Sequence, residues 1–191
     1  MKNKIFKTIL SVIFVFISGY LLLPEPPQPP PLPDSFKSPE PGDTGQIANL
    51  FAYYTNLPRN EIIAFYQKHY SSSSFLSIPL FSYKLNHPPE YAWEVIRDTI
   101  PSTFLEEVIQ PFRGSLYLAG DIPAEDPFLK NNYKRSNFLW DGKEYKTKII
   151  VYRKSSNPFI RLIVFWVSVL VLKWLILKSK RVYDENFRNH S

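Results

Sequence analysis

Residues 138–153 read FLWDGKEYKTKIIVYR and carry the clearest local folding signal in the chain. Two runs in which apolar and polar residues alternate lie on either side of Asp141 and Gly142. Alternation is typical of strands, and Asp-Gly favours a type I′ turn because both central positions of that turn need a positive φ. We therefore expect a β-hairpin. One face of its second arm should carry Tyr145, Thr147, Ile149 and Val151.

Three segments upstream of this hairpin are predicted to be extended. Residues 46–55, QIANLFAYYT, are apolar on both faces of a strand, which indicates an inner position in a sheet. Residues 71–85 begin as a polar turn and continue as an extended segment, in which Pro79 marks a sheet edge. Residues 114–121, GSLYLAGD, are predicted to form a short strand between turns.

A helix is predicted over residues 57–70, LPRNEIIAFYQKHY. Pro58 suits its first turn, where a backbone N–H has no helical partner in any case. The spacing of its apolar residues follows the helical period. The core face is expected to carry Ile62, Phe65, Tyr66 and His69.

Residues 87–112 are predicted to form two short helices separated by Pro101. Pro88 and Pro89 start the first helix, and the spacing of Thr103 and Glu106 matches a capping box at the start of the second. The expected core residues are Ala92, Val95, Ile96 and Thr99 in the first helix and Leu105, Val108 and Ile109 in the second.

These elements predict an α+β domain over residues 44–153, in which a mixed or antiparallel sheet is backed by helices. The expected order is strand, helix, strand, helix, helix and then three strands. The chain of 191 residues leaves room for this domain and for further segments at both ends. Because the chain has no cysteine, the domain must be stable without disulfides.

Both ends of the chain are predicted to be transmembrane helices. Residues 5–23 carry one charge, Lys7, and are long enough to cross a hydrocarbon core of about 30 Å. We interpret them as an uncleaved signal anchor. A cleaved signal peptide is the alternative, although a good small-x-small cleavage site is missing. Residues 159–178 are interpreted as a second span; the alternative, an interfacial amphipathic helix, would need its apolar residues on one face.

Charged and aromatic residues flank both apolar segments. Basic side chains near the ends of a span can reach the lipid headgroups, and tryptophans favour the interface. The predicted flanking charges are Lys2, Lys4, Lys7, Arg161, Lys173, Lys178, Lys180 and Arg181, and the predicted interface anchors are Trp166 and Trp174.

The net charge of +6 is concentrated at the two ends of the chain. Residues 1–23 hold three basic and no acidic side chains, residues 159–191 hold six basic against two acidic, and residues 24–158 hold 14 basic against 15 acidic. Basic residues remain on the cytoplasmic side, so we expect residues 1–4 and 179–191 in the cytoplasm and residues 24–158 outside the cell membrane. The near-neutral middle argues against nucleic-acid binding.

Residues 24–43 are predicted to be a proline-rich extended linker. Nine of the 18 residues from Pro24 to Pro41 are proline, which favours polyproline II. A stalk is one interpretation. Because only residues 154–158 separate the last predicted strand from the second span, we favour a segment that runs along the flank of the domain. A PxxP ligand for SH3-type domains is a further alternative.

No catalytic, cofactor-binding or metal-binding residue is predicted. The three histidines are not spaced like metal ligands, and the motifs of nucleotide, zinc-protease and serine-hydrolase sites are missing. His87, Glu90 and Glu94 could meet at a helix start, where the helix dipole alone also explains the acids.

A basic patch is predicted on the hairpin, at Lys143, Lys146 and Lys148. It lies shortly before the second apolar segment, where it would be able to meet anionic headgroups. A solvated strand face is the alternative interpretation.

The sequence favours a non-enzymatic interaction domain that is anchored in the cell membrane. The expected partners are the lipid bilayer and a protein of the cell envelope or membrane. The composition, with few Gly and many Lys, Asn, Ile, Phe and Tyr residues, suits an AT-rich bacterial genome.

Two other function classes remain open. An accessory subunit of a membrane transport or secretion complex would pack its spans through small residues such as Ser168. An envelope-acting enzyme or small-ligand receptor would use Glu90, Glu94 or Asp121 as acid and base, in a cleft with carboxylates about 5–9.5 Å apart.

Overall fold

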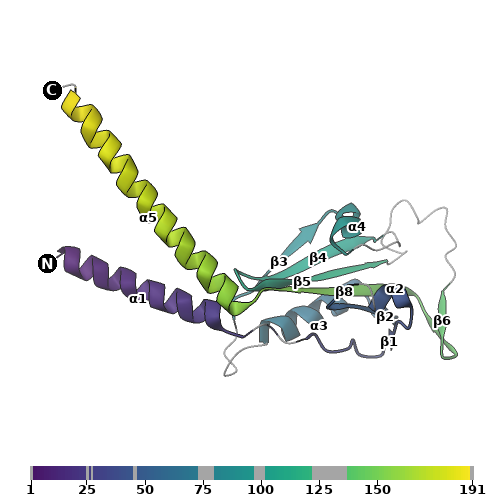
Figure 1. Cartoon of the computed structure of the whole chain (residues 1–191). Helices are drawn as coiled ribbons and strands as arrows, with labels where there is room; N and C mark the ends of the chain where they lie inside the picture. The colour runs from purple at the N-terminus through teal and green to yellow at the C-terminus, as the bar shows by residue number, and fades with distance from the viewer. Residues whose placement is uncertain are drawn as a thin grey trace. The chain divides into compact units, whose positions relative to one another are not determined.

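The computed structural model describes residues 2–24, 26, 28–44, 47–72, 80–96, 102–121 and 137–189. The chain divides into two compact units (Figure 1). One is the domain of residues 25–155, and the other consists of the two terminal segments, 1–24 and 156–191. Each unit is described separately below.

The domain is built on a six-stranded antiparallel sheet, as Figure 1 shows. This confirms the α+β class and selects the antiparallel alternative. The strands, in spatial order, are β1 (Phe36–Lys37), β2 (Leu50–Thr55), β8 (Thr147–Ser155), β5 (Gly114–Asp121), β4 (Phe104–Gln110) and β3 (Tyr83–His87). The predicted strands at 46–55 and 114–121 are thus present, and β2 lies inside the sheet.

The predicted hairpin is present as a small separate sheet of β6 (Phe138–Trp140) and β7 (Lys143–Tyr145). Asp141 and Gly142 have φ values of 50° and 72°, as a type I′ turn requires. After β7 the chain leaves the hairpin and enters the large sheet as β8. Asn56 stabilises this break, because its side chain bonds the carbonyl of Glu144 and the N–H of Lys146, each at 2.9 Å.

Helix α3 (Arg59–Ser72) covers one face of the sheet, which we call the α3 face (Figure 1). The predicted helix is confirmed, but the expected place of His69 in the core is wrong. His69 is exposed and lies against the ring of Phe65, with centroids 4.3 Å apart. One residue further on, Tyr70 turns inward instead. The core on this face contains Ile62, Ile63, Tyr66, Tyr70, Phe104, Val108, Leu116, Leu118, Ile149 and Val151.

The opposite face of the sheet, the α4 face, is covered by a shorter element. It consists of the 3₁₀ turn η2 (Pro89–Tyr91) and α4 (Ala92–Val95). The predicted core residues Ala92 and Ile96 are buried there against β2, β4, β5 and β8. Thr99, Pro101 and Pro79, which the sequence analysis also used, lie outside the described residues.

The second helix predicted within 87–112 is wrong, because residues 104–110 form β4. This strand pairs with β3 on one side and β5 on the other. Ladder pairing along both edges satisfies its backbone groups and overrides the local helix signal. Thr103 does not cap a helix; its N–H and its hydroxyl both bond the carbonyl of Gly120.

The proline-rich segment packs on the domain and adds a strand to it. Pro26 and Pro29 are buried, and Leu32 enters the core on the α3 face. The chain then forms β1 and the short helix α2 (Pro41–Thr44). At the start of the domain, the carbonyl of Pro26 accepts a hydrogen bond of 2.5 Å from Arg153 Nη1, near the end of β8.

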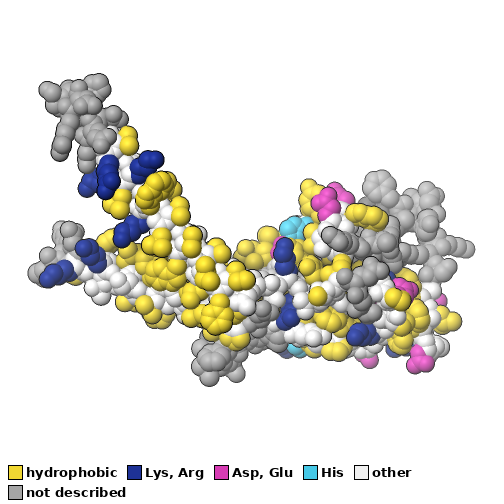
Figure 2. Space-filling model, viewed as in Figure 1, with side chains coloured by type: hydrophobic (Ala, Val, Ile, Leu, Met, Phe, Trp, Pro, Cys, Tyr) yellow, Lys and Arg dark blue, Asp and Glu magenta, His cyan; other side chains and the backbone are white. Residues whose placement is uncertain are grey.

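The terminal unit consists of α1 (Lys2–Leu22) and α5 (Pro158–Asn189). Within these helices, residues 4–22 and 158–183 are long and apolar enough to cross a membrane, judged by length and composition. Figure 2 shows hydrophobic side chains over the visible surface of both helices. The ring of Phe14 lies 5.9 Å from that of Phe165 and 5.7 Å from that of Trp166, measured between centroids.

Candidate functional site

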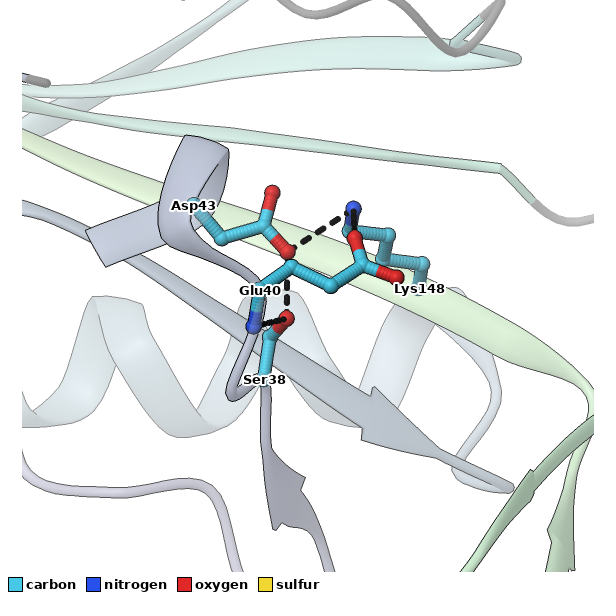
Figure 3. A network of polar contacts seen from close by, with 4 residues as sticks. All are labelled: Ser38, Glu40, Asp43 and Lys148. Carbon is cyan, nitrogen blue, oxygen red and sulfur yellow. Dashed lines mark hydrogen bonds and ion pairs between the residues drawn. The ribbon is translucent and has the colours of Figure 1, made fainter. Parts of the chain in front are cut away.

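Lys148 of β8 contacts two carboxylates of the proline-rich segment. We call Ser38, Glu40, Asp43 and Lys148 the Lys148 cluster (Figure 3). Lys148 Nζ lies 2.9 Å from Asp43 Oδ2 and 3.1 Å from Glu40 Oε2. Ser38 Oγ donates to the same oxygen of Asp43 and accepts from the N–H of Glu40 at 3.3 Å. The side chain of Lys148 is only 5 % exposed.

The surroundings of Lys148 favour its protonated form and do not favour proton exchange. Burial alone lowers the pKa of Lys148, but hydrogen bonds and charge attraction, first from Asp43 and then from Glu40, outweigh this and leave the pKa above its usual value. A lysine that acts as a base or nucleophile needs the opposite shift. The cluster therefore fastens the proline-rich segment to β8.

The same contacts correct the predicted basic patch. Lys148 is buried between carboxylates, so it does not share a surface with Lys143 and Lys146. Lys143 lies over the ring of Tyr145, 5.5 Å from its centroid, and Lys146 is exposed. The pairing was invisible in the sequence because Glu40 and Lys148 are 108 residues apart.

A second cluster joins α3 to β3, the outermost described strand, and to its neighbour β4. It consists of Arg59, Lys84 and Glu106, and we call it the Glu106 cluster. The carboxylate is 3 % exposed; it lies 2.6 Å from Arg59 Nη2 and 3.5 Å from Lys84 Nζ. The guanidinium of Arg59 also lies 4.7 Å from the centroid of Phe104. The charge of Glu106 is thus compensated inside the domain.

A third cluster lies on the α4 face and consists of His87, Glu107, Tyr117 and Tyr152. It shares the strands β3 and β4 with the Glu106 cluster. His87 Nε2 is 2.8 Å from Glu107 Oε2. Burial, followed by the hydrogen bond and the charge of Glu107, raises the pKa of Tyr117 to about 12. The ring of Tyr117 stacks on Tyr152, with centroids 6.2 Å apart and planes 21° apart. Glu107 thus contacts side chains of β3 and β5, and its carboxylate is engaged within the domain.

A polar cavity of about 300 Å³ opens beside these clusters. Among the residues that the structure describes, no carboxylate lines it. Glu106 and Glu107 are adjacent in β4, so their side chains point to opposite faces and do not form an acid–base pair across one cleft. The lining residues are Arg59, Asn86, His87, Pro88, Pro89, Thr103 and Phe104.

The acidic candidates of the sequence analysis do not come together. His87 pairs with Glu107, while Glu90 and Glu94 are exposed in η2 and α4. Asp121 is buried at the end of β5, in register with Lys148. Across the described ranges, no group of three His, Asp or Glu side chains is arranged to hold a metal ion.

The predicted membrane-flanking residues lie on the terminal helices. Lys2, Lys4 and Lys7 belong to the first two turns of α1. Arg161 belongs to the first turn of α5, where its Nε donates to the carbonyl of Ser156 at 3.0 Å. The remaining charges, Lys173, Lys178, Lys180 and Arg181, follow from the middle of α5 onward, and Trp166 and Trp174 are exposed on this helix.

Alkaline pH is expected to destabilise the domain through Tyr117 and Lys148. Both pKa values lie above those of the unfolded chain, so the folded state holds these protons more tightly. The stabilisation is complete below about pH 10 and is lost as the pH rises through the folded-state values. Urea unfolding should show a lower free energy of unfolding at about pH 11 than at about pH 9. The variant Tyr117→Phe should lose less over this range; an equal loss would contradict the role of Tyr117.

The buried carboxylates of the three clusters are paired within the domain, and large aromatic side chains are exposed elsewhere on it. Tyr91 and Trp93 are exposed on the element that covers the α4 face, and β3 is the outermost described strand of the sheet. Aromatic residues are enriched at protein interfaces. The chain matches no family model, no curated protein and no solved structure, so its function has to be argued from this geometry alone.

Proposed function

We propose that the chain is a two-span membrane protein that presents its α+β domain outside the cytoplasm to a protein partner and has no enzymatic activity. The observation that carries this proposal is the pair of long apolar helices, α1 and α5, of which one precedes and one follows the compact domain in the sequence. Their apolar side chains are exposed along most of their length. A surface of this kind needs a lipid or protein environment.

The charges at the ends of the chain support the proposed orientation. Lysines precede the apolar part of α1, and Lys178, Lys180 and Arg181 follow that of α5. Positive charge on both sides favours cytoplasmic termini, with the domain on the other side.

The non-enzymatic part of the proposal is supported by the three polar clusters. Each buried carboxylate in them is paired with a cation or a hydrogen-bond donor of the same domain. Exposed aromatic side chains, by contrast, are typical of protein interfaces. Tyr91 and Trp93 are the described residues that best fit such a contact on the domain.

Cysteine labelling tests the topology. The chain has no cysteine, so single substitutions Asn3→Cys, Asn60→Cys and Ser179→Cys give no background. Asn60 is exposed on α3 and Ser179 on α5. A membrane-impermeant maleimide applied to intact cells is expected to label only Asn60→Cys, and all three positions after the cells are opened. Labelling at the termini with protection at Asn60 would overturn the proposed orientation.

Site-specific cross-linking tests the interaction role. A benzophenone maleimide on Trp93→Cys, in intact cells, is expected to give a discrete protein adduct. The same reagent on Asn60→Cys, on the opposite side of the sheet, should not give that adduct. Identical adduct patterns at the two positions would contradict a partner surface around α4.

A further inference from the structure

Three parts of the domain meet at one end of the sheet. The register pairs Gly114 with Ser155 and Tyr83 with Ile109. The β4–β5 turn, the start of β3 and the end of β8 therefore lie at the same end of the strands, which run side by side in Figure 1. We call this the Ser155 end of the sheet.

Large aromatic side chains are exposed at the Ser155 end. Phe112 in the β4–β5 turn is 84 % exposed, and Phe81, just before β3, is 72 % exposed. Tyr83 is 40 % exposed, and its ring centroid lies 6.1 Å from that of Phe81. Burying a phenylalanine side chain is favourable, so leaving two of them in water is costly. We call Phe81, Tyr83 and Phe112 the aromatic rim.

The β4–β5 turn is built to hold Phe112 outward. Phe112 has a φ of 60°, in the left-handed region that bulky residues avoid. Beside it, the buried Arg113 donates from Nη1 to Gln110 Oε1 at 2.7 Å, and Gln110 Nε2 donates to the carbonyl of Tyr70 at 2.8 Å. These buried contacts fix both flanks of the turn while its apolar tip stays in solvent.

Chain continuity links the Ser155 end to the second apolar helix. Only Ser156 and Asn157 separate β8 from α5. Three peptide links span at most about 11 Å. If α5 crosses a bilayer, the Ser155 end must therefore lie close to the headgroups, and Lys154, exposed next to this end, adds a positive charge there.

We propose that the aromatic rim enters the interface of the bilayer that α5 crosses. This inference rests on the proposed function, because it requires α5 to be a span. Aromatic side chains favour the interface, where the ring is buried and the polar groups around it stay hydrated. The rim then holds the end of the sheet against the membrane, and the opposite end, with the β6–β7 hairpin, faces away from it.

Depth-dependent quenching tests this inference on the full chain. An NBD maleimide is attached to Phe112→Cys, to Val167→Cys in α5 or to Leu139→Cys in β6. The protein is reconstituted into phosphatidylcholine–phosphatidylglycerol vesicles with and without nitroxide-labelled lipid. Quenching is expected at positions 112 and 167 and not at 139. Quenching at 167 with position 112 unquenched, as at 139, would overturn the rim while the proposed span stands. No quenching at either 112 or 167 would overturn both.

A second set of variants keeps the label away from the rim. NBD on Lys154→Cys should be quenched when Phe112 is present, and the quenching should be weaker with Phe112→Asp, since only chain continuity then keeps position 154 near the headgroups. Aspartate tolerates a positive φ better than phenylalanine, so the turn should still form. The control Phe112→Trp should retain the quenching, since tryptophan also favours the interface. Equal quenching with Asp and Trp would contradict the role of the side chain.

Discussion

Replacing Lys148 by methionine is expected to lower the free energy of unfolding by about 3–5 kcal/mol. The variant removes the cation that lies 2.9 Å from Asp43 and leaves that carboxylate buried without its ion pair. The proline-rich segment should then detach from β8 and take β1 with it. The measurement is urea unfolding of the full chain in detergent micelles, followed by circular dichroism.

Two matched variants separate the ion pair from other effects. In Lys148→Met combined with Asp43→Asn, the amide oxygen can still accept from Ser38, and no uncompensated buried charge remains at this position. About half of the lost stability should return, because Glu40 is 48 % exposed and its carboxylate can be hydrated. Lys146→Met, at an exposed neighbour, should change stability by less than about 0.5 kcal/mol. An unchanged Lys148→Met protein would show that the cluster does not fasten the segment.

Replacing Gly114 by alanine is expected to cost about 3 kcal/mol. A Cβ at this position would overlap the carbonyl oxygen of Lys154 and come within 3.2 Å of Ser155 Cα. Both obstacles are backbone atoms, so no rotamer change can relieve the clash, and β5 must separate from the end of β8. The same urea titration measures the loss.

Gly42→Ala is the matched control for this prediction. A Cβ on Gly42, in α2, would meet no atom within 4 Å, so the change should stay within about 0.5 kcal/mol. Gly114→Ala should also weaken NBD quenching from a label at Lys154, because the rim is presented by the turn that Gly114 ends. Equal stability of the two alanine variants would show that β5 and β8 do not pack closely at Ser155.

The parts of the fold that were predictable from the sequence depend on contacts between near neighbours. Asp141 and Gly142 set the turn through their own φ values, and α3 follows from its apolar period. The strand β4 was not predictable in this way. Its residues FLEEVIQ fit a capped helix equally well, and pairing with β3 and β5 decides between the two.

The three polar clusters depend on distant contacts and were missed for that reason. The sequence predicts that Glu106 closes a capping box, yet in the structure Glu106 and Glu107 are each compensated on a different face of the sheet. The alternation of side chains along β4 would have predicted that the two carboxylates point to opposite faces. It could not have identified the residues that pair with each of them. Phe112 gave no signal at all, because its exposure follows from a turn that exists only once β4 is a strand.

The hydrogen bond between Pro26 and Arg153 joins the point where the chain enters the domain to the point where it leaves. A domain whose two ends are fastened together behaves as a closed insertion between the helices on either side of it. Tension applied between those helices would load this joint together with the last pairs of β8, in which Lys154 and Ser155 face Ser115 and Gly114 of β5. A domain of different size could therefore replace this one only if its own two ends were held equally close.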